Sequence, residues 1–283
     1  MNALEVVNLS KRYPKFTLDN VSFCVEQGRI VGLIGRNGAG KTTTLKGIIR
    51  LISASGSVSV FGKNFATDEN AVKEMIGYVG GGFRYYPTKT LASIRKVVSS
   101  FYSNWNQETY EKYLTLFNLD ETKKVRELSD GMRVKFSLAL AISHGAKLLI
   151  MDEPTSGLDP LSREEFCDVI LSLVEREQVT VLFSTHITND LMRIADDIIY
   201  IANGKVLVSE PLNELLSKYS LAHFSSREDA EQAHAIGVKH VKNGWSGLLT
   251  AESSQAGANV TAATLDDVMV HLELENTRRI GDA

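Results

Sequence analysis

Cysteine is scarce in this chain of 283 residues, which contains only Cys24 and Cys167. The two lie far apart in the sequence, so their spacing indicates neither a disulfide framework nor a pair of metal ligands. We expect both to be buried, reduced thiols, as is usual for proteins of the cytosol.

Long apolar runs and an excess of positive charge are missing as well. No segment approaches the roughly 20 apolar residues of a membrane-spanning helix, and residues 1–10 lack the pattern of a secretory signal. We therefore expect any membrane role to depend on a partner protein. The formal net charge of -3 does not indicate the dense basic face of a protein that coats nucleic acid, so no nucleic-acid partner is expected.

Short apolar runs alternate with helical patterns over most of the chain. Residues 21–25 alternate between apolar and polar, which is typical of a half-buried strand. Nearly continuous apolar runs, which indicate strands buried on both faces, lie at 30–34, 147–151 and 179–183. Helical patterns lie between them, for instance at 161–175. This repeated order predicts an α/β fold in which helices cover a parallel sheet.

A stretch in the middle of this pattern is different. From about residue 83 to residue 144 the apolar spacing becomes helical, with one face marked by Leu91, Ile94 and Val98. We interpret it as a helical subdomain inserted into a main domain that spans residues 1–210.

The remaining residues, 211–283, form a C-terminal accessory region in this interpretation. Its sequence is polar and rich in alanine and serine, with a short helix expected at 212–219 and a strand at 248–251. A second helix is expected at 265–274, because Thr264 and Asp267 have the spacing of a capping box at its start.

The strongest local signal is the segment Gly35–Thr42, which fits the phosphate-binding pattern G-x-x-x-x-G-K-[ST]. It follows the apolar strand that ends at Ile34 and precedes a helical pattern. Glycines let the backbone N–H groups of such a loop surround an anion, and the helix N-terminus adds a favourable partial charge. We expect Lys41 to reach the β- and γ-phosphates of a nucleotide and the hydroxyl of Thr42 to bind Mg²⁺.

Two acidic residues, Asp152 and Glu153, follow the apolar strand at 147–151. Ligands of open α/β sheets bind at the carboxyl ends of the strands, so these acids are expected beside the phosphate-binding loop. Asp152 would hold Mg²⁺, directly or through water, and Glu153 would act as general base toward the attacking water.

Four further segments give the chain a resemblance to the ATPases of ABC transporters. Leu128–Met132 resembles the signature loop of that family, usually LSGGQ, and Ser156–Asp159 resembles its D-loop. Ser184–His186 resembles the segment of its switch histidine, and Tyr13 matches the aromatic residue that stacks on adenine. The motifs occur in the family's order, over roughly residues 4–208.

The resemblance implies the family's fold and its cofactors, ATP and Mg²⁺. The fold would be a RecA-like P-loop NTPase, with a mostly parallel sheet, an N-terminal antiparallel β subdomain, the inserted helical subdomain and a small C-terminal α/β region. The residues implied for catalysis are Lys41, Glu153 and His186, and those implied for Mg²⁺ are Thr42 and Asp152. The residues implied for nucleotide binding are Tyr13, Gly35, Arg36, Asn37, Gly38, Ala39, Gly40, Lys41, Thr42, Thr43, Ser129, Gly131 and Asp159.

The resemblance also implies how such a subunit works. Two subunits would bind ATP between them, head to tail, so that the signature loop of one closes over the phosphate-binding loop of the other. The partners would be a transmembrane permease, most resembling that of an exporter, and a second ATPase in a homodimer or heterodimer. The protein would be cytoplasmic and would sit on the inner face of the membrane through the permease.

Two departures from the family pattern bear on this mechanism. The family has a glutamine after the strand at 76–79, whereas this chain reads Gly80-Gly81-Gly82, with Gly81 at the glutamine's place. The hypothesis is that hydrolysis is coupled to the helical subdomain differently. In the signature loop Asp130 replaces a glycine and Met132 replaces the glutamine. We expect the Asp130 carboxylate to point away from the phosphates.

Other interpretations stay open at this point. The chain could be a regulatory subunit with weak turnover, an ABC ATPase outside transport, or a small-molecule kinase. A kinase would leave the signature loop and His186 without a role. The aromatic residues near the start of the helical insert could either form its core or contact a permease; they are Phe83, Tyr85, Tyr86, Phe101, Tyr102 and Trp105. The histidines of the C-terminal region are too loosely spaced to predict a metal site.

Overall fold

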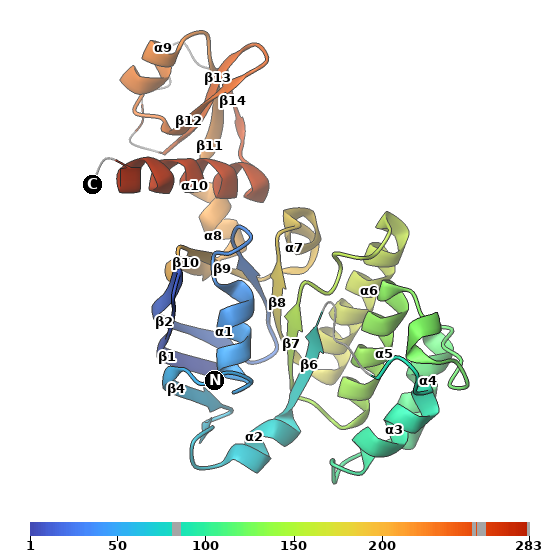
Figure 1. Ribbon diagram of the computed structural model, residues 1–283. Helices are drawn as coiled ribbons and strands as arrows, with labels where there is room; N and C mark the ends of the chain where they lie inside the picture. Colours follow the sequence, from blue (N-terminus) through green and yellow to red (C-terminus); the bar gives the residue numbers. More distant parts are fainter. Residues whose placement is uncertain (81–85, 251–252, 254–258, 282–283) are drawn as a thin grey trace.

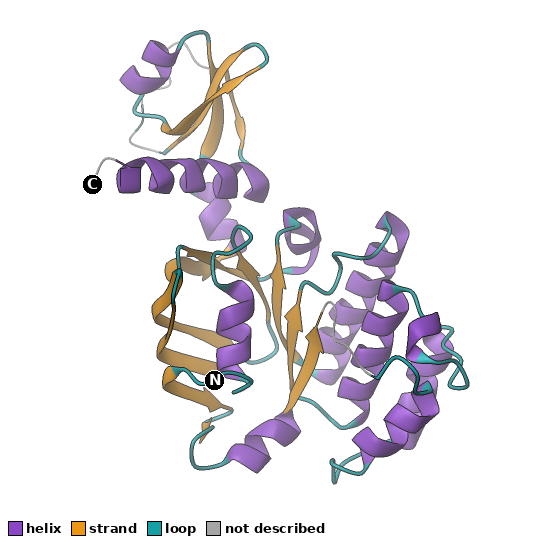
Figure 2. Cartoon of the chain, viewed as in Figure 1, coloured by secondary structure: helices purple, strands orange, loops and turns teal. Residues whose placement is uncertain are grey.

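The computed structural model describes residues 1–80, 86–250, 253 and 259–281, and within these ranges it contains three β-sheets (Figures 1 and 2). The first is antiparallel, with the order β2-β1-β4-β5. Its strands are β1 (Asn2–Tyr13), β2 (Phe16–Glu26), β4 (Ser55–Val60) and β5 (Lys63–Asn64). The predicted alternation at 21–25 is confirmed, because Val21, Phe23 and Val25 are buried. Cys24 is therefore exposed and only Cys167 is buried, so the expectation of two buried thiols was wrong for Cys24.

The second sheet has the order β10-β9-β3-β8-β7-β6, and all its pairings are parallel except that of β10 with β9. Its strands are β3 (Ile30–Ile34), β6 (Ile76–Gly80), β7 (Leu148–Asp152), β8 (Thr180–Thr185), β9 (Asp197–Ala202) and β10 (Lys205–Pro211). Every residue of β3, β7 and β8 is buried, as their continuous apolar runs predicted. The mostly parallel α/β core is thus confirmed.

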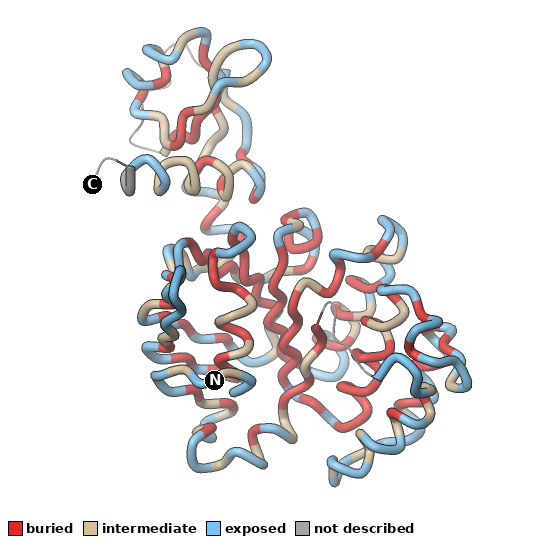
Figure 3. The backbone as a smooth tube through the Cα atoms, in the orientation of Figure 1, coloured by how far each residue is buried: buried red, intermediate tan, exposed pale blue. Residues whose placement is uncertain are grey.

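Apolar residues cover both faces of this central sheet, which Figure 3 shows as a buried layer through the molecule. On one face, Leu33 and Ile150 pack with α1 (Lys41–Ile48) and the antiparallel sheet. On the other, Ile34 and Met151 pack with the helices α5 (Asp130–Ser143) and α6 (Pro160–Glu177). Two shorter helices, α2 (Glu69–Met75) and α7 (Thr188–Ile194), flank the sheet.

The described residues between β6 and β7, from 86 onward, are mostly helical, as predicted. They contain α3 (Leu91–Ser99), α4 (Gln107–Leu116), the 3-10 turn η1 (Val125–Glu127) and α5. Side-chain caps start three of these helices, because Thr90, Asn106 and Ser129 each accept a hydrogen bond from a backbone N–H of the first turn.

The third sheet lies in the C-terminal part and has the antiparallel order β12-β13-β11-β14. The elements here are α8 (Leu212–Ser217), β11 (Ser220–Phe224), α9 (Arg227–Gln232), β12 (Ile236–Val241), β13 (Gly244–Leu249), β14 (Asn259–Ala262) and α10 (Leu265–Gly281). The strand β13 includes the start of the strand expected at 248–251 and ends at Leu249, and residue 251 lies outside the described residues. The predicted capping box is confirmed, since Thr264 and Asp267 each accept a hydrogen bond from the other's backbone N–H.

Candidate active site

The carboxyl ends of β3, β7 and β8 bring three separate segments of the chain to one edge of the central sheet. A cavity of about 440 Å³ lies there. It is lined by Phe16, Arg36, Asn37, Gly38, Gly40, Lys41, Thr42, Thr43, Glu153, Ser156 and His186. Most of the residues predicted from the phosphate-binding loop, together with both predicted catalytic partners of Lys41, thus face the same space.

Glycine is required by the backbone at both ends of the phosphate-binding loop. Gly35 has φ 153, and a Cβ atom there would lie 2.2 Å from the carbonyl oxygen of Ile201. Gly40 has φ 117, in the left-handed region, and a Cβ atom there would lie 2.9 Å from the ring of Phe16. The loop therefore fits closely between β9 and the start of β2. Within it, Ala39 is buried rather than exposed to the cavity.

Lys41 is 5% exposed, and its ammonium group is held by the loop itself. Nζ donates to the carbonyl oxygen of Gly35 at 2.7 Å and to that of Arg36 at 3.3 Å. It also lies 3.4 Å from Oε1 of Glu153. A positive charge is thereby fixed at the floor of the cavity, where it can meet an anionic ligand.

Thr42 and Asp152 place two oxygen atoms side by side. The hydroxyl of Thr42 donates to Oδ1 of Asp152 at 3.0 Å, and the hydroxyl of Ser184 donates to the same oxygen at 2.8 Å. Hard oxygen ligands such as these suit Mg²⁺, which usually takes one or two protein ligands and completes its shell with phosphate and water. In the described ranges there is no group of three His, Cys, Asp or Glu side chains that could hold a metal.

Glu153 has a left-handed backbone with φ 50, which is uncommon for a residue other than glycine. Ser184 stabilises it, because the N–H of Glu153 donates to the Ser184 carbonyl at 3.0 Å and lies 3.2 Å from its hydroxyl. The carboxylate accepts the backbone N–H of His186 at 3.3 Å and lies 2.7 Å from its Nδ1. One backbone turn thus aims the carboxylate into the cavity between Lys41 and His186.

Four residues predicted for nucleotide binding lie elsewhere in the described structure. Tyr13, at the end of β1, is 39% exposed and does not line the cavity. Asp159 caps α6 by accepting the N–H of Ser162 at 3.0 Å. Ser129 and Gly131 lie at the start of α5, on the helical part of the chain, and do not line the cavity of their own copy.

The signature loop packs against the D-loop of the same chain. A Cβ atom on Gly131 would lie 2.4 Å from Cδ2 of Leu158, so a larger residue here would require the Leu158 side chain or the loop to shift. The carboxylate of Asp130 is 74% exposed and pairs with Arg133 at 2.6 Å. The substituted aspartate is thus exposed and paired with a cation of its own helix. That its carboxylate points away from the phosphates stays a prediction.

Sequence reasoning missed three residues of the site. Phe16 and Ser156 line the cavity, and Ser184 anchors both acids. No sequence motif marked Phe16, because an aromatic residue in an amphipathic strand is usually part of the hydrophobic core. Ser184 and Ser156 stood inside the motifs already recognised, and a small polar residue at the buried end of a strand could have identified Ser184.

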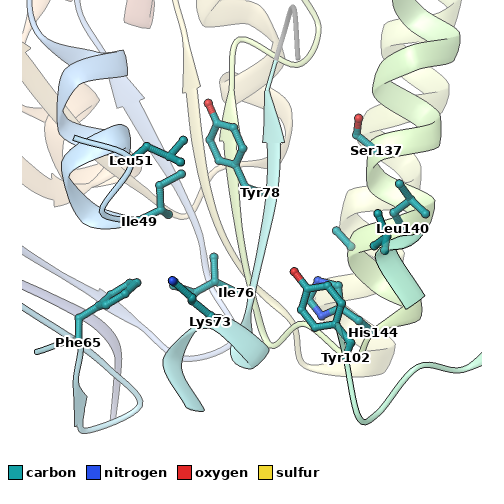
Figure 4. Close-up of a pocket in the computed structure, with 12 residues that line it drawn as sticks. Ile49, Leu51, Phe65, Lys73, Ile76, Tyr78, Tyr102, Ser137, Leu140 and His144 are labelled. Atoms are coloured by element: carbon teal, nitrogen blue, oxygen red, sulfur yellow. The ribbon is translucent and has the colours of Figure 1, made fainter. Parts of the chain in front are cut away.

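A second cavity, of about 320 Å³, separates the central sheet from the helical part (Figure 4). Phe65, Tyr78 and Ile49 on one side face Ser137 and Leu140 of α5 on the other. We refer to it as the interlayer groove. Its lining consists of Ile49, Leu51, Phe65, Lys73, Ile76, Tyr78, Val98, Tyr102, Ser137, Leu140, Ala141 and His144.

The aromatic residues at the start of the helical insert differ in burial, and contact of the exposed ones with a permease stays a prediction. Tyr102 stacks on His144 in the interlayer groove, with ring centroids 3.8 Å apart, and Trp105 packs against the core near Tyr110. Tyr86 and Phe101 are 78% and 76% exposed. Phe83 and Tyr85 lie outside the described residues, as do Gly81 and Gly82 of the glycine run, whereas Gly80 ends β6.

Comparisons with known proteins show which family the chain is similar to. The family model described as ABC transporter matches residues 18–156. The chain is 32% identical over 216 residues to the bacitracin transport ATP-binding protein BcrA of Bacillus licheniformis, covering 75% of this chain and 71% of that protein. It is 34% identical to the uncharacterized ABC transporter ATP-binding protein YdbJ of Bacillus subtilis, covering 72% and 67%.

Solved structures show the same fold. A structure of an ATP-binding subunit of an ABC transporter matches with a TM-score of 0.68 and 29% identity, over 75% of this chain and 91% of that one. The dimeric bacterial ABC transporter cassette MJ0796 matches with a TM-score of 0.65 and 24% identity, over 74% and 98%.

Proposed function

This chain belongs to the ABC transporter family of ATP-binding proteins, and we propose that it hydrolyses ATP to power a separate membrane permease, as an exporter does. The observation that carries the proposal is the placement of the Glu153 carboxylate in the phosphate-loop cavity, 3.4 Å from Nζ of Lys41 and 2.7 Å from Nδ1 of His186. A base, an anion-binding cation and a second polar group converge there, as phosphoryl transfer to water requires.

The proposed roles follow from these contacts. Lys41 and the loop from Gly35 to Thr43 would bind the phosphates. Glu153 would accept a proton from the attacking water, and His186 would hold the Glu153 carboxylate and contact the γ-phosphate. Thr42 and Asp152 would hold Mg²⁺, which neutralises charge on the phosphates when bound. Phe16 joins the proposed set as a wall of the cavity, and Tyr13 keeps its proposed role beside adenine.

We propose that the working unit contains two ATPase subunits around ATP. Ser129 and Gly131 would serve the nucleotide of the second copy, because both lie at the start of α5 outside the cavity of their own chain, and Ser129 is exposed there while Gly131 is buried. The N–H groups of such a helix start suit a phosphate anion. Asp159, at the start of α6, would lie near the same junction. The second subunit would be a copy of this chain, in a homodimer, or a related ATPase, in a heterodimer.

The interlayer groove is the proposed binding site for the permease. It is largely apolar, and exposed apolar residues stand nearby, including Leu51 at 61% and Phe101 at 76% exposure. Within the described ranges, no helix combines the length and apolar character needed to cross a membrane. We propose that this protein is cytoplasmic and reaches the inner face of the membrane by docking there.

We propose the same domain organisation that the sequence predicts. Residues 1–210 would form the ATPase domain, with the helical subdomain inserted at about 83–144, and residues 211–283 would form a C-terminal accessory region. The antiparallel sheet of β11 to β14, with its own small buried cluster around Phe224 and Val238, supports treating that region as a unit.

A regulatory subunit with weak turnover is the second candidate, because Gly81 stands where the family has glutamine. Phosphate release by the wild type and by Glu153→Gln, each reconstituted with its permease, separates the two. Transport-linked hydrolysis that depends on Glu153 supports the ATPase engine. Equal and negligible release by both proteins would support the regulatory subunit.

A further inference from the structure

Glu273 of the C-terminal helix α10 contacts Arg36 of the phosphate-binding loop. The two residues are 237 positions apart in the sequence (273 − 36 = 237). Oε1 of Glu273 lies 3.7 Å from Nη1 of Arg36, and Oε2 accepts a hydrogen bond from the hydroxyl of Tyr200 at 2.5 Å. The Glu273 side chain is only 12% exposed. One carboxylate of the accessory region therefore touches both the loop and the strand beside it.

The packing of α10 explains how it arrives there. Figure 1 shows α10 lying between the C-terminal sheet and the rest of the molecule. Leu265 and Val268 belong to the same buried cluster as Tyr200 and Leu212, so the apolar core is continuous from the ATPase domain into this helix. A second face of α10 binds β12, through His271 to the carbonyl of Gly237 at 2.7 Å.

Tyr200 links Glu273 to the strand that leads into the phosphate-binding loop. It is 1% exposed on β9 and pairs in register with Ile34, the residue before Gly35. Burial and then the hydrogen bond to Glu273 raise the pKa of Tyr200, so the phenol stays protonated and donates. The Glu273 side chain is thereby fixed from its buried side, and its other oxygen faces Arg36.

Arg36 is the member of this contact that also lines the nucleotide cavity. Its side chain is 66% exposed, so the guanidinium can turn toward an anion in the cavity or toward Glu273. A negative charge beside it lowers the positive potential that a triphosphate would meet, and the effect reaches over about 10 Å at moderate ionic strength.

We propose that α10 is part of the nucleotide site and that Glu273 competes with the triphosphate of ATP for Arg36. Glu273 acts as a positioning residue: it holds Arg36 toward the accessory region and so lowers the affinity of the loop for ATP. By linkage, ATP binding weakens the docking of α10 to the same extent. The inference rests on the proposed nucleotide site.

The test compares Glu273→Gln with Glu275→Gln in the full chain. Both variants remove one negative charge from α10, but Glu275 lies on the face that binds β12, where it accepts the N–H of Gly237 at 3.1 Å. The glutamine at 273 still accepts the hydrogen bond of Tyr200, so the helix keeps its anchor. Melting temperatures check that both variants fold.

The expected result is a roughly threefold lower Kd for ATP in Glu273→Gln, with a smaller change for ADP and a smaller change at high salt. Glu275→Gln should bind ATP as the wild type does, and Arg36→Ala should abolish the difference made by Glu273→Gln. Equal ATP Kd values for wild type and Glu273→Gln, or a difference that persists without Arg36, would overturn the inference.

Hydrogen exchange provides a second measurement. If Glu273 only stabilised the fold, ATP would not change the exchange rates of α10. ATP should accelerate amide exchange in α10 of the wild type, and should leave it unchanged in Glu273→Gln. Slower or unaltered exchange in the wild type would contradict competition for Arg36. Failure of the wild type to bind ATP at all would instead count against the proposed nucleotide site.

Discussion

Oε2 of Glu153 lies 2.7 Å from Nδ1 of His186, although the two residues are 33 positions apart in the sequence. Parallel strands β7 and β8 are neighbours in the sheet and end at the same edge, which brings the two side chains together. The left-handed backbone of Glu153 then turns its carboxylate toward the cavity.

The first prediction concerns Glu153→Gln, which keeps the shape of the side chain and removes its basicity. We expect turnover of ATP to fall by about 10²- to 10⁴-fold, the usual contribution of a general base, while ATP still binds. Phosphate release measures turnover, and an ATP titration measures binding. Wild-type turnover in this variant would show that another group takes the proton.

Ser184→Ala tests the support of the two acids. Ser184 donates to Oδ1 of Asp152, so its removal should loosen the oxygen pair that is proposed to hold Mg²⁺. We expect the Mg²⁺ concentration for half-maximal hydrolysis to rise roughly tenfold, the scale seen when partners of metal ligands are removed. ATP binding without Mg²⁺ should change little. An unaltered Mg²⁺ dependence would exclude this role.

Gly131→Ala tests the contact between the signature loop and the D-loop. The added methyl would lie 2.4 Å from Cδ2 of Leu158, so either that buried side chain or the helix start must shift. We expect a loss of about 1–3 kcal/mol in unfolding free energy and impaired hydrolysis. The double variant with Leu158→Ala provides room for the methyl and should recover part of the activity. If the double variant is no more active than Gly131→Ala, steric conflict is not the cause.

The unfolding free energy should depend on pH through His144. Burial lowers the pKa of His144 from the ordinary 6.5 to about 4. Between these values the unfolded chain takes up a proton that the folded protein does not. The unfolding free energy should therefore fall as pH drops from 6.5 toward 4, by up to about 1.4 kcal/mol per pH unit.

Denaturant titrations of His144→Phe across that range measure the contribution. Phenylalanine keeps a flat ring beside Tyr102 and does not titrate, so the slope should decrease. Part of the slope should remain, because burial also lowers the pKa of His271. The exposed His240→Phe serves as the control, and an equal slope in all three proteins would refute the assignment.

The sequence predicted the central sheet and the phosphate-binding loop because both are local signals. Apolar runs mark β3, β7 and β8, and the spacing of Gly35, Gly40 and Lys41 marks the loop. Together with the strand ends, these signals brought Glu153 and Asp152 to the right edge of the sheet.

Contacts made by the tertiary fold were not predictable in this way. Phe16 reaches the cavity through the packing of β2 against the loop, and Glu273 reaches Arg36 through the docking of α10. Neither the contact of Phe16 with the loop nor that of Glu273 with Arg36 produces a recognisable pattern in the sequence. Cys24 was misplaced because a thiol was assumed to be core, although the alternation of β2 turns that position to solvent.

The central claim is that ATP is bound between the phosphate-binding loop of one subunit and the start of α5 of another. The most direct test is the solution mass of Glu153→Gln with ATP and with ADP, measured by light scattering, beside the same protein carrying Ser129→Phe. We predict a dimer with ATP and a monomer with ADP. The Ser129→Phe protein should bind ATP and stay monomeric, because Ser129 lies outside the cavity of its own chain. An ATP-loaded Glu153→Gln monomer, or a Ser129→Phe protein that dimerises equally well, would contradict the account.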